Sequence, residues 1–205
     1  MFLDLDSGAD SAFTSLSALV VPRPIGWIST LSSDGTANLA PYSFFNGVGY
    51  NPPQVMFAAT GNHDHGGLKD AVRDAQATGE FVVNLATWEL REQMSASSVP
   101  APSNVDEFEY AGLAKAPARL VKCPRVADSP VHLECLHIRS VELDCQDPNE
   151  TNIVVFGQVI GVHIDDRVLT DGRVDFLKLR PIGRLGYMDY VEVNNAFTMQ
   201  RPNWG

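Results

Sequence analysis

Small hydroxyl and amide side chains alternate with aromatic ones along residues 23–60, a segment that reads RPIGWISTLSSDGTANLAPYSFFNGVGYNPPQVMFAAT. A flat, partly apolar ligand needs apolar walls against its faces and hydrogen-bonding groups in the plane of its edge. The backbone N–H groups of a bent strand over residues 40–43, with the side chains of Asn38, Ser43 and Asn46, could supply that edge. The segment is therefore our candidate ligand site.

A phosphate-binding end is predicted for the same segment. Ser29 and Thr30 follow an apolar run, and Lys69, near a predicted helix start, could add a cation. The charge of a phosphate favours several short, charge-assisted hydrogen bonds. The same residue types would equally suit a barrel whose aromatic side chains fill the core and whose hydroxyl groups cap strand ends. Chemistry alone leaves both interpretations open.

Other chemical motifs in the chain are weaker. Gly47 and Gly49 lack the third glycine of a dinucleotide-binding turn, and two prolines follow them, so no helix can begin there. The chain has no Walker-type sequence and no Gly-x-Ser-x-Gly nucleophile turn. His63-Asp64-His65 has no recognisable third ligand, which favours a solvated loop over a metal site. We predict no metal, and any nicotinamide would bind outside a Rossmann crevice.

The formal net charge of −10 over 205 residues limits the partners of the chain. Phosphate backbones and anionic membranes attract basic proteins, so this charge argues against general nucleic-acid or membrane-surface binding. No apolar run of the sequence approaches the roughly 18 residues that a membrane helix requires. The N-terminus has no basic stretch before an apolar core, and the 3 cysteines favour reduced thiols. We therefore expect a cytoplasmic protein.

Glycine, proline and small polar residues divide the chain mainly into strands. After Pro22 and Pro24 we expect a strand over residues 25–31, a tight turn, and a returning strand that stops at Pro41, because proline cannot donate to a sheet. The other expected elements are a loop at 46–53, strands at 54–59 and 80–86, a helix that Gly79 closes, a short helix that Thr87 caps, a loop at 96–106 and a hairpin of strands 131–145 and 153–165.

These elements amount to about six or seven strands with two or three helices, without regular β-α-β alternation. The order favours a mainly β, antiparallel barrel with peripheral helices over a doubly wound parallel sheet. We expect a single domain over residues 1–205, with a loose leader at 1–20 and a tail at 191–205. The 96–106 loop is unusually long for a compact domain, and such loops are either disordered or functional.

The segment RPIGWISTLSSDGTANLAPYSFFNGVGYNPPQVMFAA resembles the signature of the flavin reductase-like, FMN-binding split-barrel family, which includes flavoredoxin-type proteins. The likeness continues through KDAVRDAQATGEFVVNLAT, VDEFEYAGL, PARLVKCPRVADSPVHLEC and RPIGRLGYMDY, so it covers roughly residues 20 to 190. The resemblance implies an antiparallel FMN-binding split β-barrel. It also implies a homodimer with one FMN per subunit at or near the dimer interface.

Matching positions carry the family's flavin contacts onto this chain. The resemblance places Trp27, Ser29 and Thr30 along the ribityl-phosphate side of FMN, and it places toward the ring Asn38, Ala40, Pro41, Tyr42, Ser43 and Asn46. The family's helix usually opens with a lysine or histidine, a polar residue and a threonine at the phosphate. Here these positions are Lys69, Asp70 and Ala71, so one expected hydroxyl contact is missing.

The activity that the resemblance implies is that of an FMN-dependent oxidoreductase. It would take hydride from NADH or NADPH onto the flavin and pass electrons to a second acceptor, with a partner oxygenase as one candidate, or release the reduced flavin. The flavin carries this chemistry, so we name no catalytic residue. A flavoredoxin-like electron carrier and a flavin-binding module without reductase activity are the alternatives. We expect the 96–106 loop to shape the acceptor side.

Overall fold

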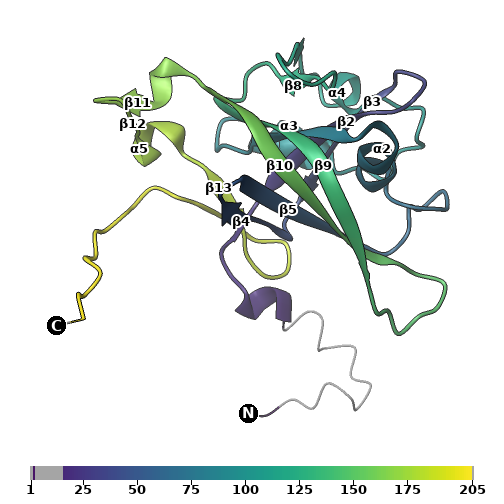
Figure 1. Ribbon diagram of the computed structural model, residues 1–205, viewed down its shortest axis with the longest axis horizontal. Helices are drawn as coiled ribbons and strands as arrows, with labels where there is room; N and C mark the ends of the chain where they lie inside the picture. Colours follow the sequence, from purple (N-terminus) through teal and green to yellow (C-terminus); the bar gives the residue numbers. More distant parts are fainter. Residues whose placement is uncertain (1, 3–15, 205) are drawn as a thin grey trace.

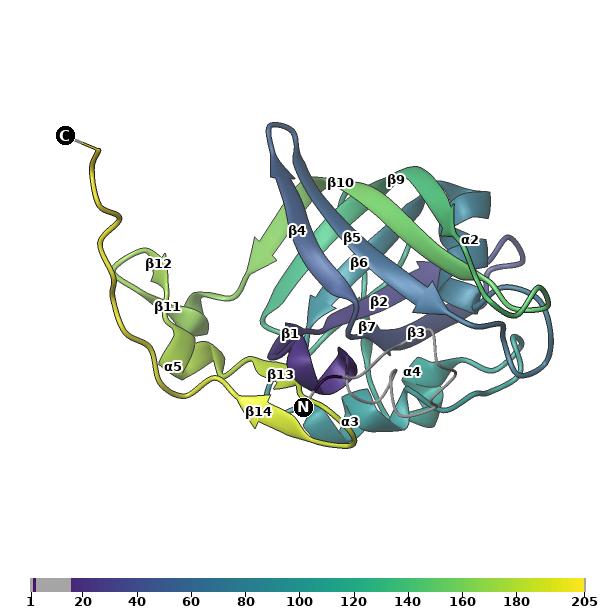
Figure 2. The ribbon, with the colours of Figure 1, turned by 90° about the horizontal axis from the view of Figure 1, so that it is seen from below.

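Seven strands of the computed structural model, which describes Phe2 and residues 16–204, form one antiparallel sheet (Figure 1). In sheet order they are β3 (Ala37–Tyr42), β2 (Gly26–Leu31), β6 (Glu80–Leu85), β9 (Val131–Leu143), β10 (Asn152–Ile164), β5 (Pro53–Thr60) and β4 (Phe45–Tyr50). The sheet must curl, because its two edge strands, β3 and β4, are separated in the chain only by residues 43–44. Figure 2 shows the resulting barrel. The predicted mainly antiparallel β fold with peripheral helices is confirmed.

Smaller elements surround this barrel. A three-stranded sheet of β1 (Arg23–Pro24), β13 (Ile182–Arg184) and β14 (Tyr190–Glu192) brings the C-terminal part of the chain beside the start of the barrel. The rest comprises helices α2 (Asp70–Thr78), α3 (Arg91–Ala96), α4 (Glu107–Tyr110) and α5 (Phe176–Leu179), the 3-10 turn η2 (Asp166–Val168), and the short pairs β7 (Lys115–Ala116) with β8 (Arg125–Val126) and β11 (Leu169–Thr170) with β12 (Arg173–Val174).

The two ends of the chain are described to different extents. The expected leader lies largely outside the described residues, whose first helical turn covers residues 16–19. At the other end, β14 still pairs with β13, and residues 193–204 then run away from the barrel without regular structure (Figures 1 and 2). Among the described residues, no helix is long and apolar enough to span a membrane.

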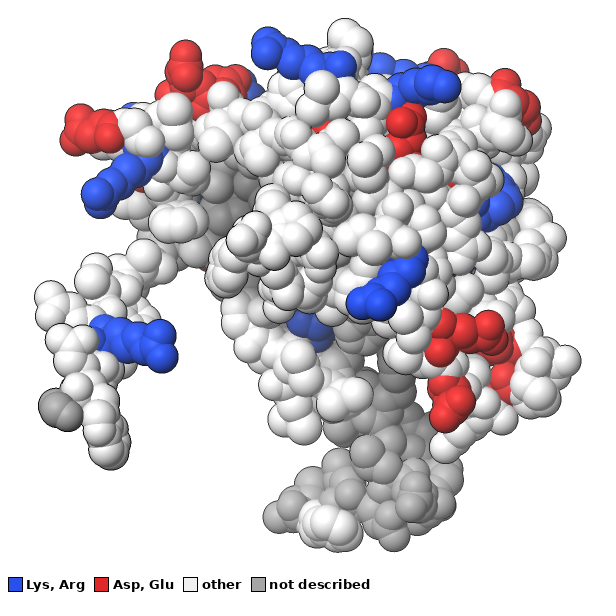
Figure 3. Space-filling model, in the orientation of Figure 1, with Lys and Arg blue, Asp and Glu red and all other residues white. Residues whose placement is uncertain are grey.

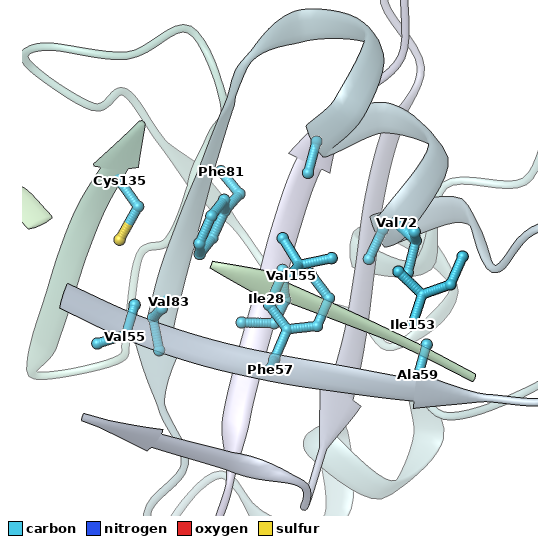
Figure 4. Packing of buried hydrophobic residues seen from close by; sticks show 12 residues of the cluster. Ile28, Val55, Phe57, Ala59, Val72, Phe81, Val83, Cys135, Ile153 and Val155 are labelled. Atoms are coloured by element: carbon cyan, nitrogen blue, oxygen red, sulfur yellow. The ribbon is translucent and has the colours of Figure 1, made fainter. Parts of the chain in front are cut away.

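The interior of the barrel is apolar and fixes the position of helix α2. Ile28, Phe57, Phe81 and Val155 are fully buried and converge from four strands (Figure 4). Ala71 of α2 is also fully buried in this cluster. Its side chain therefore belongs to the core at the position where the family resemblance implies a threonine hydroxyl.

Three local predictions are wrong. Strand β3 does not stop at Pro41 but pairs with β2 through Tyr42, and because β3 is an edge strand a missing N–H is tolerated there. Residues 46–50 are not a loop but most of β4, which pairs with β5 through a bulge between Gly47 and Gly49. Thr87 does not cap a helix. It bridges to Pro181, and α3 begins only at Arg91.

Candidate functional site

Two adjoining cavities lie against the edge strand β3 and share Pro41, Tyr42, Lys69 and Ser98 as walls. The smaller, about 170 Å³, holds the carboxyl groups of Asp70 and Glu107, and we call it the acidic cavity. The larger, about 630 Å³, is lined by the cations Arg23, Lys69 and Arg184 and, among the residues that the structure describes, by no carboxyl group; we call it the basic cavity. Together they form one cleft with charge of opposite sign at its two ends.

Glu107 is one of the two buried acids that line the acidic cavity. It opens the one-turn helix α4 and is only 4% exposed, and its Oε2 accepts hydrogen bonds from Asn38 Nδ2 at 3.1 Å and Leu39 N at 3.0 Å. Burial raises the pKa of its carboxyl group to about 7, although these hydrogen bonds oppose the shift. Glu107 can therefore both hold and release a proton near neutral pH.

Asp70 is the first residue of helix α2, and it connects this helix to the segments that contain His63 and Ser103. Its carboxylate accepts a hydrogen bond from the hydroxyl of Ser103 at 2.7 Å, pairs with the guanidinium of Arg73, and lies 3.3 Å from His63 Nε2. A carboxylate at a helix N-terminus also interacts favourably with the helix dipole. The segment 97–101, part of the loop that we predicted to be functional, lines the same cavity. Asp70 is thus a positioning residue for this loop.

Tyr42 stands at the boundary between the two cavities. Its ring packs on Phe57, with centroids 5.0 Å apart. Burial, together with the negative charges of Asp70 and Glu107, raises the pKa of its phenol above the ordinary value. The hydroxyl group therefore stays protonated and can act as a hydrogen-bond donor toward a ligand.

The basic cavity combines positive charge with apolar and aromatic walls. Phe44, Tyr187 and Tyr190 line it together with the three cations. Much of the negative charge of the chain lies elsewhere, for example at the tip of the β9–β10 hairpin (Figure 3), where Glu142, Asp144, Asp147 and Glu150 are exposed. The cavity is therefore a local exception to the overall charge of −10.

Seven of the eleven residues predicted to bind a ligand line this cleft. Six of them contribute to the acidic cavity, some to both, namely Asn38, Ala40, Pro41, Tyr42, Lys69 and Asp70. Ser43 lines the basic cavity. Asn46 lies on the exposed part of β4 and lines neither cavity.

The other three predicted residues are inside the protein. Trp27 is fully buried, and its Nε1 donates to Ser97 Oγ at 2.9 Å, beneath the cavity-lining loop. The hydroxyl of Ser29 donates to Pro124 O at 2.6 Å. The hydroxyl of Thr30 donates to Asp74 Oδ2 at 3.2 Å. Both residues are fully buried, so a phosphate could reach these hydroxyl groups only if this part of the sheet rearranged.

The chain matches the model of the flavin reductase like domain over residues 17–181. It belongs to the flavin reductase-like family. The flavin reductase-like chain is 39% identical over 192 residues to an uncharacterized protein of Aquifex aeolicus, and the match covers 93% of this chain and 94% of the relative.

Solved structures agree with this assignment. Component B of nitrilotriacetate monooxygenase from Bacillus cereus superposes with a TM-score of 0.91 at 25% identity, covering 97% of this chain and 98% of that one. A Shewanella frigidimarina protein with a split barrel domain superposes with a TM-score of 0.80 at 20% identity over 100% of both chains, which shows the fold alone. The family and the split-barrel fold inferred from the sequence are therefore confirmed.

Sequence reasoning missed several lining residues of this flavin reductase-like protein. Arg23 and Arg184 are 161 positions apart, and no motif marks either as a ligand contact. Glu107 sits in an ordinary helix start, Asp-Glu-Phe-Glu. His63 was interpreted as part of a solvated loop, whereas its imidazole is 8% exposed and lies against Asp70. The only signal that could have pointed to the loop wall was the length of the 96–106 segment.

Proposed function

We propose that this flavin reductase-like protein binds FMN in the cleft and is an oxidoreductase that accepts hydride from NADH or NADPH. Electrons then pass to a second acceptor, or the reduced flavin is released. The observation that carries this proposal is the joining of a strand edge, aromatic walls and three cations in one cleft of an acidic chain. A ligand with a flat ring and a phosphate tail needs these same features: hydrogen-bonding groups at the ring edge, apolar walls against the ring and positive charge at the phosphate.

The residues of the cleft fit such a group chemically. The larger cavity of about 630 Å³ falls within the usual range for small-molecule sites. Pro41 and Phe44 offer apolar walls, Asn38 and Ser43 offer polar groups beside them, and the cations suit a phosphate. FMN, when bound, would supply the hydride-accepting ring.

The protein's own residues would then position the ligand and control its surroundings. Tyr42, held protonated, would donate a hydrogen bond to the ligand at the boundary of the two cavities. Glu107 accepts from the backbone of β3 and can exchange a proton near neutral pH, so it sets the charge of the acidic end. The segment 97–101 covers that end and limits the access of water and of the second acceptor.

We further propose a homodimer that works in the cytoplasm and reduces a partner protein such as an oxygenase. The likeness to a monooxygenase component B supports an oxygenase as the acceptor. The strand pair β9–β10 supports the dimer, because it leaves six apolar side chains between 40% and 56% exposed: Leu136, Ile138, Val141, Leu143, Val162 and Ile164. Light scattering on the purified protein measures the mass of the assembly directly.

Anaerobic absorbance spectra test the oxidoreductase proposal. The purified protein is loaded with FMN and mixed with NADH or with NADPH, and rapid bleaching of the flavin with either is the expected result. A protein that binds FMN but is bleached by neither nucleotide would instead be a flavoredoxin-like carrier. A colourless preparation that FMN cannot restore would remove both redox functions.

A further inference from the structure

Arg23 and Arg184 are directly opposite each other in the sheet formed by β1 and β13. Like charges at directly opposed positions destabilise a sheet. Arg184 also contributes to a pKa of Arg23 below the ordinary value, second to the effect of burial. The pairing therefore works against folding unless something else compensates the positive charge.

No carboxylate of the described residues provides that compensation. Neither guanidinium has a carboxylate oxygen within 4.0 Å in that part of the chain, and no aspartate or glutamate lines the basic cavity. Arg23 is nonetheless only 7% exposed. A buried guanidinium without a counter-ion is costly, because burial removes the water that would stabilise its charge.

The contacts of Arg23 fix its position without neutralising it. Its guanidinium donates to neutral oxygens: the carbonyl groups of Ser17, Val20 and Leu185, and more distantly the hydroxyl of Ser43 at 3.4 Å. These bonds explain why an arginine ties the 16–20 turn to the loop after β13. They do not explain why a second arginine stands opposite it.

Arg184 is held by the turn that forms one rim of the cavity. Its guanidinium donates to the hydroxyl of Tyr190 and the carbonyl of Tyr187, and it lies 4.4 Å from the centroid of the Tyr190 ring. Tyr187 adopts a φ of 58° and is 66% exposed. Backbone strain at a non-glycine residue is found most often at active sites and ligand contacts.

We propose that the basic cavity binds the phosphate or diphosphate group of a nucleotide, with Arg184 as its ion-pair partner and Arg23 as a fixed positive wall. Tyr187 and Tyr190 would contact the flat ring or ribose of the same molecule. The inference rests on the proposed function, which involves two phosphate-bearing ligands. These are FMN, with its monophosphate, and a nicotinamide dinucleotide, with its diphosphate. It places the anion away from Ser29 and Thr30, whose hydroxyl groups are buried.

Isothermal titration calorimetry on the full chain with FMN, riboflavin and ADP-ribose tests the proposal. The key variant is Arg184→Gln, and the matched control is Arg173→Gln, which removes the same charge from an exposed position on β12. We expect Arg184→Gln to weaken one phosphate-bearing probe by about tenfold, the scale of one charge-assisted contact. Riboflavin affinity and all affinities of the control should stay unchanged.

The probes separate the two sources. Loss of FMN affinity alone assigns the cavity to the flavin phosphate, and loss of ADP-ribose affinity alone assigns it to the dinucleotide. Arg184→Lys keeps the charge and should retain most of the affinity. If it behaved like Arg184→Gln, the bonds to the 187–190 turn would matter rather than the charge, and the proposal would be overturned.

Two further results would also overturn it, and they differ in what they say of the function. Unchanged affinities in Arg184→Gln, with FMN still bound by the wild type, would remove only the phosphate site. Absence of binding of every probe to the wild type would remove the site and the flavin-dependent function together. Circular dichroism on each variant confirms that its fold is intact.

Discussion

The two ends of the cleft handle buried charge in opposite ways. In the acidic cavity every buried carboxyl group meets hydrogen-bond donors of the protein: Glu107 meets Asn38 and Leu39, and Asp70 meets Arg73 and Ser103. In the basic cavity the guanidinium groups of Arg23 and Arg184 contact neutral oxygens, a thioether sulfur and aromatic rings, but no carboxylate of the described residues. A buried charge that other groups of the protein compensate can help to hold the fold together, whereas a charge without a counter-ion can pair with a charged ligand.

Reversing the charge at the basic end should have the largest effect. Arg184→Glu places a carboxylate opposite Arg23, where it would form an internal ion pair and repel a phosphate. We expect the affinity for the phosphate-bearing nucleotide to fall by about 100-fold, or about 2.7 kcal/mol. Fluorescence titration of FMN and of NADPH measures this loss, with Arg173→Glu as the control. Equal losses in the two variants would mean that only net charge matters.

Removing the charge at the acidic end should affect pH-dependent stability. Glu107 has an ordinary pKa of 4.5 when unfolded and about 7 when folded, so the fold favours its protonated form. The contribution of Glu107 to the free energy of unfolding is therefore complete below pH 4.5 and is lost as the pH rises through 7. The amide oxygen of Glu107→Gln can accept the same two hydrogen bonds. The variant should therefore gain about 1–3 kcal/mol relative to wild type on going from pH 5 to pH 8.

Urea unfolding at the two pH values measures this difference. Glu109→Gln provides the control, since Glu109 is the exposed acid of the same helix. A difference between Glu107→Gln and wild type that is the same at both pH values would show that burial does not shift the Glu107 pKa.

The smallest effect on ligand affinity is expected at the buried hydroxyl of Ser29. Ser29→Ala leaves the carbonyl of Pro124 without its donor, which should lower the free energy of unfolding by about 1–2 kcal/mol. FMN affinity should change less than twofold. Ser43→Ala provides the opposite case, because Ser43 lines the basic cavity. It should weaken FMN severalfold with little loss of stability.

Thermal unfolding and FMN titration on both serine variants separate these outcomes. A large loss of FMN affinity in Ser29→Ala at unchanged stability would restore the phosphate role that the family resemblance implies for this residue.

Local sequence signals were reliable where a single residue determines the backbone. Gly35 has a φ of 92° in the tight turn after β2, and Gly79 has a φ of 78° at the end of α2, as their positions predicted. The long hairpin of β9 and β10 also followed its pattern. Strand β4 was missed because its sequence, Phe-Asn-Gly-Val-Gly-Tyr, has two glycines and no alternation of apolar and polar residues, and its pairing with β5 depends on the sheet.

The sequence identified the family, the antiparallel fold and most of the cleft-lining residues of β3, since those residues are contiguous in the chain. Only the folded structure could decide which polar groups remain available. It buries Ser29 and Thr30 against partners 95 and 44 positions away, and it places Arg184 opposite Arg23. Strand pairing and register set these contacts, and both depend on segments that are distant in the chain.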